Sequence, residues 1–221
     1  MWKVVEAIID NRVRESIRLH DVLHGFRSGR GMGMVILELN LAQELDRVYQ
    51  YPLFLIFLDL EKSYNTVYRG NLLTDMEGYD TGPHMYMLLE VFWEQKEVVT
   101  LQNGYHSPQF KATRGTNQGE IISPTLFNLL LYNLASKWLA LTVEDQLFAQ
   151  EVLGLVVGRF LGLFYADNSM AGSQDPELLQ GALNVLISLF SRYGLVANFA
   201  KSKAMACQPD TLRSWILEEA V

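Results

Sequence analysis

The sequence contains little of several residue types, and each shortage excludes a class of protein. Its 221 residues include one cysteine, Cys207, so an internal disulfide framework and a thiolate metal cluster are excluded. The six prolines and sixteen glycines are near the average for folded proteins, which excludes a collagen-like or linker-like chain. Apolar residues form 49% of the chain, enough for a buried core. The composition therefore indicates one large folded domain, or one domain with two lobes.

Long hydrophobic runs are also lacking. Apolar stretches such as residues 53–58 are far too short to cross a bilayer. The N-terminus carries Lys3 and Glu6 where a secretory signal needs an apolar segment. We therefore expect a soluble, intracellular protein with no membrane partner.

The chain also has no excess of basic residues over acidic ones. The chain has 18 Lys and Arg residues against 25 Asp and Glu residues, a formal net charge of −7. Nucleic-acid binders usually carry a basic field, because neutralising phosphates dominates their affinity. The global balance argues against that class of protein, but a local basic groove remains compatible with it.

Helical periodicity appears twice in the first 50 residues, on either side of a Gly- and Arg-rich loop at residues 24–31. The predicted inward faces are Val5, Ile8, Ile9 and Val13 in the first helix, and Leu37, Leu41, Leu45 and Val48 in the second.

Strands and helices then alternate irregularly. Residues 53–60 read as a strand buried on both faces, residues 98–110 as a hairpin, and residues 159–172 as strand, tight turn and strand. Further helices are expected over residues 82–93 and 123–140, and from Asp175 to a stop at Gly194. Mixed elements without regular βαβ repeats predict an α+β fold.

Two acidic residues occupy positions suited to chemistry. Asp59 ends the buried strand and Asp167 lies at the tip of the later hairpin. An aspartate at either place is more often a cap or a turn residue. If the fold brings the two carboxylates together, however, they form a hard-oxygen site that suits Mg²⁺.

Motifs around these acids occur in a specific order. They read GFRSGRG at 25–31, FLDLEKSY at 57–64, GTNQG at 115–119, SPTLFN at 123–128, FYAD at 164–167 and GLVANFAKSK at 194–203. The series resembles the reverse transcriptase family, particularly its non-LTR retrotransposon and group II intron branch. The resemblance implies the fingers and palm of a right-hand polymerase, with an antiparallel palm sheet backed by helices. It assigns residues 1–50 and 70–115 to the fingers, 51–69 and 116–206 to the palm, and 207–221 to the start of a connection to an absent thumb.

The resemblance also assigns roles to single residues. Asp59, Asp167 and the carbonyl of Leu60 would bind Mg²⁺, with Mn²⁺ as the alternative ion, and Lys201 would protonate the departing pyrophosphate. Tyr64 would exclude a ribose 2′-hydroxyl, Gln118 and Gly119 would form the nucleotide-pocket turn, and Arg27 or Arg30 would contact the triphosphate. The expected partners are an RNA template with a DNA primer, dNTPs, and a thumb or endonuclease region supplied elsewhere. Without the motifs, Tyr64 reads equally well as a core residue, and the arginines and Lys201 as solvated surface.

Three residues depart from the family pattern. The catalytic turn normally carries two successive aspartates, and here the second is Asn168. Asn65 replaces another acid after the aromatic gate, and Glu120 replaces a small residue after Gly119. A neutral amide binds Mg²⁺ more weakly than a carboxylate, so catalysis at this site should be weakened or lost.

Three functions follow as hypotheses. The first is an RNA-directed DNA polymerase impaired by Asn168. The second is an inactive reverse-transcriptase-like module that binds RNA or a protein. The third is a packing element of a larger assembly, with no ligand of its own.

Overall fold

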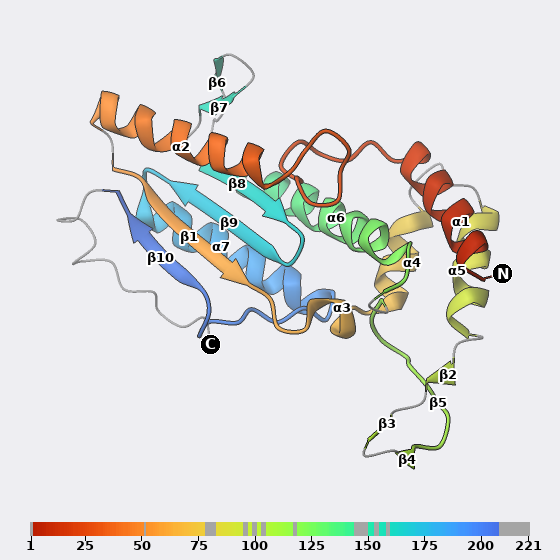
Figure 1. The fold of residues 1–221 in the computed structure, drawn as a ribbon. Helices are drawn as coiled ribbons and strands as arrows, with labels where there is room; N and C mark the ends of the chain where they lie inside the picture. Colours follow the sequence, from red (N-terminus) through yellow and green to blue (C-terminus); the bar gives the residue numbers. More distant parts are fainter. Residues whose placement is uncertain are drawn as a thin grey trace. The chain divides into compact units, whose positions relative to one another are not determined.

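The computed structural model describes residues 2–50, 52–77, 83–94, 97–98, 101–102, 105–116, 119–143, 150–152, 155–157 and 160–207. Helices and antiparallel strands are mixed without regular βαβ repeats (Figure 1), as the α+β prediction expects. The chain divides into two compact units, Met1–Arg18 with Lys62–Phe127, and Leu19–Glu61 with Asn128–Val221. Across the described residues, no helix combines the length and apolar character needed to span a membrane.

The first unit is mainly helical. Its helices are α1 (Trp2–Ser16), α3 (Ser63–Thr66), α4 (Arg69–Glu77) and α5 (Pro83–Glu94), and α6 (Ser123–Val143) begins in it. Four short strands form two antiparallel pairs, β2 (Glu97–Val98) with β5 (Phe110–Lys111) and β3 (Leu101–Gln102) with β4 (Tyr105–His106). These pairs agree with the predicted hairpin, although its turn residues Asn103 and Gly104 lie outside the described residues.

The predicted inward face of α1 is correct only in part. Ile9 and Val13 are buried, but Ile8 is 50% exposed. Glu6 and Asp10 are buried in place of further apolar residues. Periodicity of apolar residues alone missed this face, because two of its inward positions carry acids.

The second unit is built on one four-stranded antiparallel sheet. The strands β10 (Lys203–Ala206), β1 (Phe54–Asp59), β9 (Asn168–Ser173) and β8 (Phe160–Tyr165) follow one another in this order. The short strands β6 (Gln150–Val152) and β7 (Leu155–Val157) pair separately. The predicted strand, tight turn and strand at residues 159–172 is thus confirmed as β8 and β9, and the central strand β1 is buried as expected.

Helix α2 (Met32–Tyr49) covers one face of this sheet (Figure 1). Leu55, Leu163 and Met170 are buried on that face, and Val35 and Leu39 of α2 pack against them. Alternate residues of a strand point to the same face. Asp59, at the end of β1, therefore lies on the face covered by α2. Leu55 of the same strand points to that face as well.

The predicted inward face of α2 is wrong at Leu37 and Val48, whereas Leu41 is half-buried and the Leu45 side chain lies outside the described residues. Leu37 is 61% exposed and Val48 is 67% exposed, whereas Val35 and Leu39 pack on the sheet. Apolar residues occur almost all round this helix, so its pattern does not identify the side that the sheet covers.

Helices α6 and α7 (Pro176–Arg192) pack on the opposite face of the sheet. The ring of Trp138 in α6 meets Phe164 of β8 edge-on, with 5.7 Å between the ring centroids. Its Nε1 donates a hydrogen bond of 2.8 Å to the carbonyl of Ala182 in α7. Asp175 caps α7 by accepting from two backbone amides, which confirms the predicted helix start.

Candidate active site

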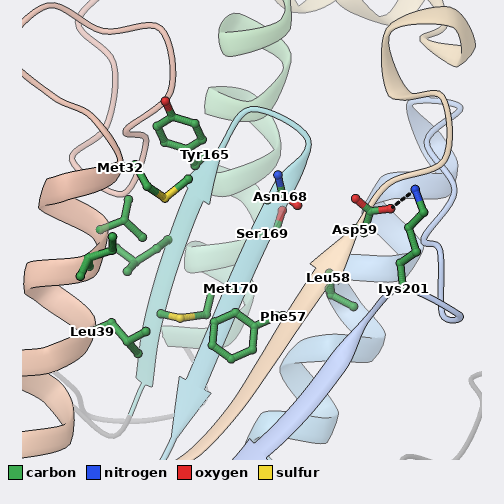
Figure 2. A pocket seen from close by; sticks show the side chains of 13 residues that line it. Met32, Leu39, Phe57, Leu58, Asp59, Tyr165, Asn168, Ser169, Met170 and Lys201 are labelled. Atoms are coloured by element: carbon green, nitrogen blue, oxygen red, sulfur yellow. Dashed lines mark ion pairs between the residues drawn. The ribbon is translucent and has the colours of Figure 1, made fainter.

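Strand register places the acidic residues of β1 and of the hairpin at one corner of the second unit. Asp59, the last residue of β1, is the direct cross-strand partner of Asn168, the first residue of β9. Directly opposed residues of an antiparallel pair have neighbouring side chains. Asp167 precedes Asn168 in the turn, so the corner contains two carboxylates and one amide. Figure 2 shows the Asp59 and Asn168 side chains at the same end of adjacent strands.

The turn that carries Asp167 is a tight one. Tyr165 pairs with Asn168, which leaves Ala166 and Asp167 as the only residues between β8 and β9. Ala166 has a positive φ of 53° and a buried side chain. A residue with a side chain rarely adopts this backbone conformation, so surrounding contacts must hold the turn in place.

The loop that precedes α2 supplies those contacts. The His24 amide donates to the Phe164 carbonyl at 2.9 Å, and the Phe164 amide donates to Val22 at 2.8 Å. A Cβ atom on Gly25 would lie 2.6 Å from the backbone nitrogen of Ala166. The predicted loop at residues 24–31 is confirmed, and its Gly25 allows the close approach to the turn at Ala166.

Asp59 is bracketed by the segment that follows α7. The Asn198 amide donates to the Asp59 carbonyl at 2.8 Å, and the Asp59 amide donates to Ser202 Oγ at 3.3 Å. The same segment places Lys201 Nζ 3.6 Å from Asp59 Oδ2 (Figure 2). Lys201 is 71% exposed and the Asp59 side chain 24% exposed, so the ion pair is partly screened by water.

The remaining donors at the corner are Asn168 and Leu60. Asn168 Nδ2 lies 3.4 Å from Asp167 Oδ1, a long hydrogen bond within the turn. Leu60 forms an isolated bridge with Ala197, whose framing hydrogen bonds use the Asp59 carbonyl and the Glu61 amide. Neither bond uses the Leu60 carbonyl.

The donor set fits a hard divalent cation in kind. Asp59 and Asp167 contribute carboxylate oxygens and Asn168 an amide oxygen, which are ligand types of Mg²⁺. The set is low in charge, since within the described residues no cluster of three His, Cys, Asp or Glu side chains is placed to bind one metal ion. The ion pair between Lys201 and Asp59 further reduces the negative charge at the corner.

A groove of about 320 Å³ lies between α2 and the sheet and ends at this corner. Its walls are mostly apolar, including Leu39, Phe57 and Met170, and its polar end has Asp59 and Asn168 (Figure 2). Asp59 and Asn168 therefore lie beside an apolar groove.

Both predicted triphosphate arginines are engaged within their own loop. Arg27 donates to the carbonyls of His20 at 2.7 Å and Leu23 at 2.9 Å. Arg30 donates to the Asp21 carbonyl at 2.7 Å and pairs with its carboxylate. In this structure the two guanidinium groups hold the loop in shape, and their contact with a triphosphate stays a prediction.

The first residue of that loop is a buried histidine, His24. The His24 ring is fully buried, with Nε2 3.4 Å from Glu38 Oε2 of α2. Burial lowers the pKa of His24, and the nearby Arg30 and Arg27 lower it further. With its pKa lowered, the ring favours the neutral form, and neither of its nitrogens has a hydrogen-bond partner among the described residues.

The remaining predicted residues lie in the first unit. Tyr64 stacks on Phe127, with ring centroids 4.7 Å apart and an interplanar angle of 19°, and its carbonyl accepts from the Thr116 amide at 2.7 Å. Gly119 has a positive φ of 89°, a conformation that favours glycine, and its place in a nucleotide pocket stays a prediction. Gln118 lies outside the described residues.

Sequence reasoning missed several residues that shape these sites. Phe127 stacks on Tyr64, Ser202 bonds to the Asp59 amide, and Gly25 lies close to the turn at Ala166. A signal was present for all three, since each lies inside a motif, but a motif position does not indicate its partner in the fold.

Comparison with known proteins supports the resemblance to reverse transcriptases. A family model described as reverse transcriptase (RNA-dependent DNA polymerase) matches residues 1–214. The RNA-directed DNA polymerase from mobile element jockey of Drosophila funebris is 23% identical over 209 residues, which are 90% of this chain and 21% of that protein. The chain thus spans about a fifth of that relative.

Solved telomerase structures have the same fold. The telomerase of Candida tropicalis, in complex with a TWJ fragment of telomeric RNA, matches with a TM-score of 0.66 and 15% identity, over 93% of this chain and 33% of that one. The Candida albicans telomerase in the corresponding complex matches with a TM-score of 0.64 and 14% identity, over 93% and 34%. At such identities the likeness concerns the fold alone, and it confirms the predicted fingers-and-palm architecture.

Proposed function

Since this chain belongs to the reverse transcriptase family, we propose that it is an RNA-directed DNA polymerase domain whose catalytic corner is formed by Asp59, Asp167 and Asn168. The observation that carries the proposal is the register that opposes Asp59 to Asn168, one residue from Asp167. The reaction would add a deoxynucleotide to the 3′-hydroxyl of a DNA primer on an RNA template. The telomerase relatives that were solved with RNA support an RNA ligand for this fold.

In this proposal Asp59 and Asp167 would hold divalent ions, Mg²⁺ or Mn²⁺, and the Leu60 carbonyl would supply a further oxygen. When bound, such ions stabilise the attacking 3′-oxygen and the leaving pyrophosphate. Asn168 contributes a neutral oxygen where a second acid would add a negative charge, so catalysis is impaired. The side chains of Asp59 and Asn168 start on neighbouring strands, so little movement is needed to bring their oxygens together.

The nucleotide would be selected by residues of the first unit. The half-buried ring of Tyr64, fixed by its stacking on Phe127, would occupy the space of a ribose 2′-hydroxyl and favour dNTPs. Gln118 and Gly119 would form the turn beneath the nucleotide. Arg27 or Arg30 would reach the triphosphate only after leaving its present carbonyl partners.

Lys201 has two roles in this scheme. Its ammonium group can protonate the departing pyrophosphate. Before a divalent ion binds, the same group neutralises Asp59 at 3.6 Å. The ammonium and the divalent ion would therefore compete for one carboxylate.

Replacing Lys201 with methionine tests that competition. We expect Lys201→Met to lower the dissociation constant for Mn²⁺ by roughly threefold to tenfold, because a positive charge leaves the site. Free Mn²⁺ can be followed by electron paramagnetic resonance. Lys203→Met is the matched control, since it removes the same charge from an exposed position on β10. Equal effects of both substitutions would contradict a specific role for the ion pair.

The second candidate function is an inactive module that binds RNA or a protein. Asn168 and the neutralised Asp59 favour it, because both reduce the charge available to divalent ions. The polymerase candidate predicts extension of a primer, and the inactive module predicts none.

Primer extension on an RNA template decides whether Asp59 is catalytic. We expect Asp59→Asn to lower the extension rate by roughly a hundredfold or more, because loss of a metal ligand removes several kcal/mol of transition-state stabilisation. Glu61→Gln removes the same charge from an exposed position two residues away and should leave the rate unchanged. Extension that survives Asp59→Asn would refute the proposed corner. Absence of extension in the parent chain, with RNA still bound, would favour the inactive module.

A further inference from the structure

One edge of α1 is lined with polar side chains that all reach the same segment of the first unit. Lys3, Glu6 and Asp10 are spaced three and four residues apart, which places them on one side of a helix. Each contacts residues between Gly119 and Thr125, the stretch that leads into α6 and forms its first turn. The edge thus faces the turn that the family resemblance assigns to the nucleotide pocket.

The contacts act on backbone as well as on side chains. Lys3 Nζ donates to the carbonyl of Gly119 at 2.8 Å. Glu6 Oε2 accepts from the amide of Ile121 at 3.1 Å. Asp10 accepts from the hydroxyl of Thr125. Two of the three contacts fix main-chain groups on either side of Glu120.

Both acids are buried, at 3% exposure for Glu6 and 6% for Asp10. Buried carboxylates are unfavourable unless they are paired and hydrogen-bonded. Here each has a cation from its own helix, Lys3 Nζ at 3.2 Å from Glu6 and Arg14 Nε at 2.8 Å from Asp10. Apolar residues would hold α1 against its surroundings equally well, but only directional bonds fix the backbone of the turn.

The contacted segment leads directly into α6. Gly119 has a positive φ of 89°, which glycine adopts without steric cost, and α6 begins at Ser123. The Ile121 amide precedes the helix, where unsatisfied N–H groups favour a nearby negative charge. Glu6 supplies that charge from a distant part of the sequence, so α1 acts as a cap on the segment before α6.

We propose that Glu6 and Asp10 are positioning residues for the incoming deoxynucleoside triphosphate, acting through the Gly119–Thr125 segment. The inference rests on the proposed polymerase function. Glu6 and Asp10 make no contact with the nucleotide in this scheme; they hold the backbone against which it binds. Small displacements of a binding surface weaken ligand positioning strongly.

The test is the affinity of dTTP for the chain bound to an RNA template and a dideoxy-terminated DNA primer. Glu6→Ala should raise the dissociation constant for dTTP roughly tenfold, because the Ile121 amide loses its acceptor. Glu6→Gln keeps an acceptor oxygen and should stay within about twofold of the parent. Glu15→Ala is the matched control, since it removes an exposed acid from the same helix.

Two further readouts separate positioning from mere stability. Hydrogen exchange of the Ile121 amide should accelerate in Glu6→Ala and remain slow in Glu6→Gln. Thr125→Val, which removes the donor to Asp10 and keeps the side-chain shape, should raise the dTTP dissociation constant several-fold even if Glu6→Ala does not fold.

The outcomes are distinct. If the parent binds dTTP and every folded variant binds it equally well, the inference is wrong and the polymerase proposal stands. Equal losses in Glu6→Gln and Glu6→Ala would overturn the role of the hydrogen bond. If the parent complex binds no dTTP, the proposed function itself fails, and the inference fails with it.

Discussion

Replacing Asn168 with aspartate is expected to tighten Mn²⁺ binding by roughly tenfold to a hundredfold, since an added unit charge near the ion contributes about 1.4–2.8 kcal/mol in a partly solvated site. Asn168 lies opposite Asp59 in the sheet, so the new carboxylate joins an existing acidic corner. RNA-templated primer extension should rise in parallel. Without divalent ions, the same change should lower the melting temperature, because another negative charge then adds repulsion.

The matched control is Asn40→Asp. Asn40 is exposed on α2, so this substitution makes the same chemical change away from the corner. It should alter neither Mn²⁺ affinity nor extension. Equal Mn²⁺ affinities for Asn168→Asp and the parent would show that residue 168 takes no part in metal binding.

The second large effect is expected at Gly25. A Cβ atom there would lie 2.6 Å from the backbone nitrogen of Ala166, closer than real Cβ contacts allow. Because the obstacle is main chain, the turn at Ala166 or the loop must shift. We expect Gly25→Ala to destabilise the fold by about 1–3 kcal/mol, which lowers the melting temperature by roughly 3–10 °C for a chain of this size.

Gly33→Ala provides a control of opposite sign. Gly33 is an exposed residue of α2 with nothing within 4 Å of an added Cβ. Alanine there should stabilise the protein by about 0.5–1 kcal/mol, because alanine favours the helix. If Gly25→Ala unfolds at the same temperature as the parent, the close approach of the loop to Ala166 is not a constraint on the turn.

Much of the second unit was predictable from local patterns. The short apolar run before Asp59 predicted a buried strand, because its length and its flanking residues favour a strand over a helix. The stretch around Asp167 predicted a strand, a tight turn and a second strand. Asp175 and Gly194 predicted both ends of α7, because capping chemistry is local. The motif order then implied that these strands share one sheet, and the observed strand order confirms it.

Other features required the fold itself. The pattern of α2 could not indicate which side is covered, since Leu37 and Leu39 are equally apolar and only Leu39 packs on the sheet. Nothing in the sequence identified Glu6 and Asp10 as buried acids, because their partners lie more than a hundred residues away in sequence. Long-range pairing of this kind leaves no periodic signal.

The candidate site was predicted as a set of residue types, and its geometry was not. Asp59 and Asn168 could be named from motifs, but their direct opposition depends on strand register. The ion pair between Lys201 and Asp59 depends on the path of residues 196–202 past the end of β1. The engagement of Arg27 with backbone carbonyls was equally invisible, because a loop sequence does not specify its internal hydrogen bonds.

The most direct test of the central claim compares DNA-primer extension on an RNA template by Asn168→Asp and by Asn168→Asp combined with Asp59→Asn. The proposed corner predicts extension by the first variant and a loss of roughly a hundredfold or more in the second. Equal extension by both variants would contradict the assignment of Asp59. Bound RNA without extension in either variant would contradict the polymerase function.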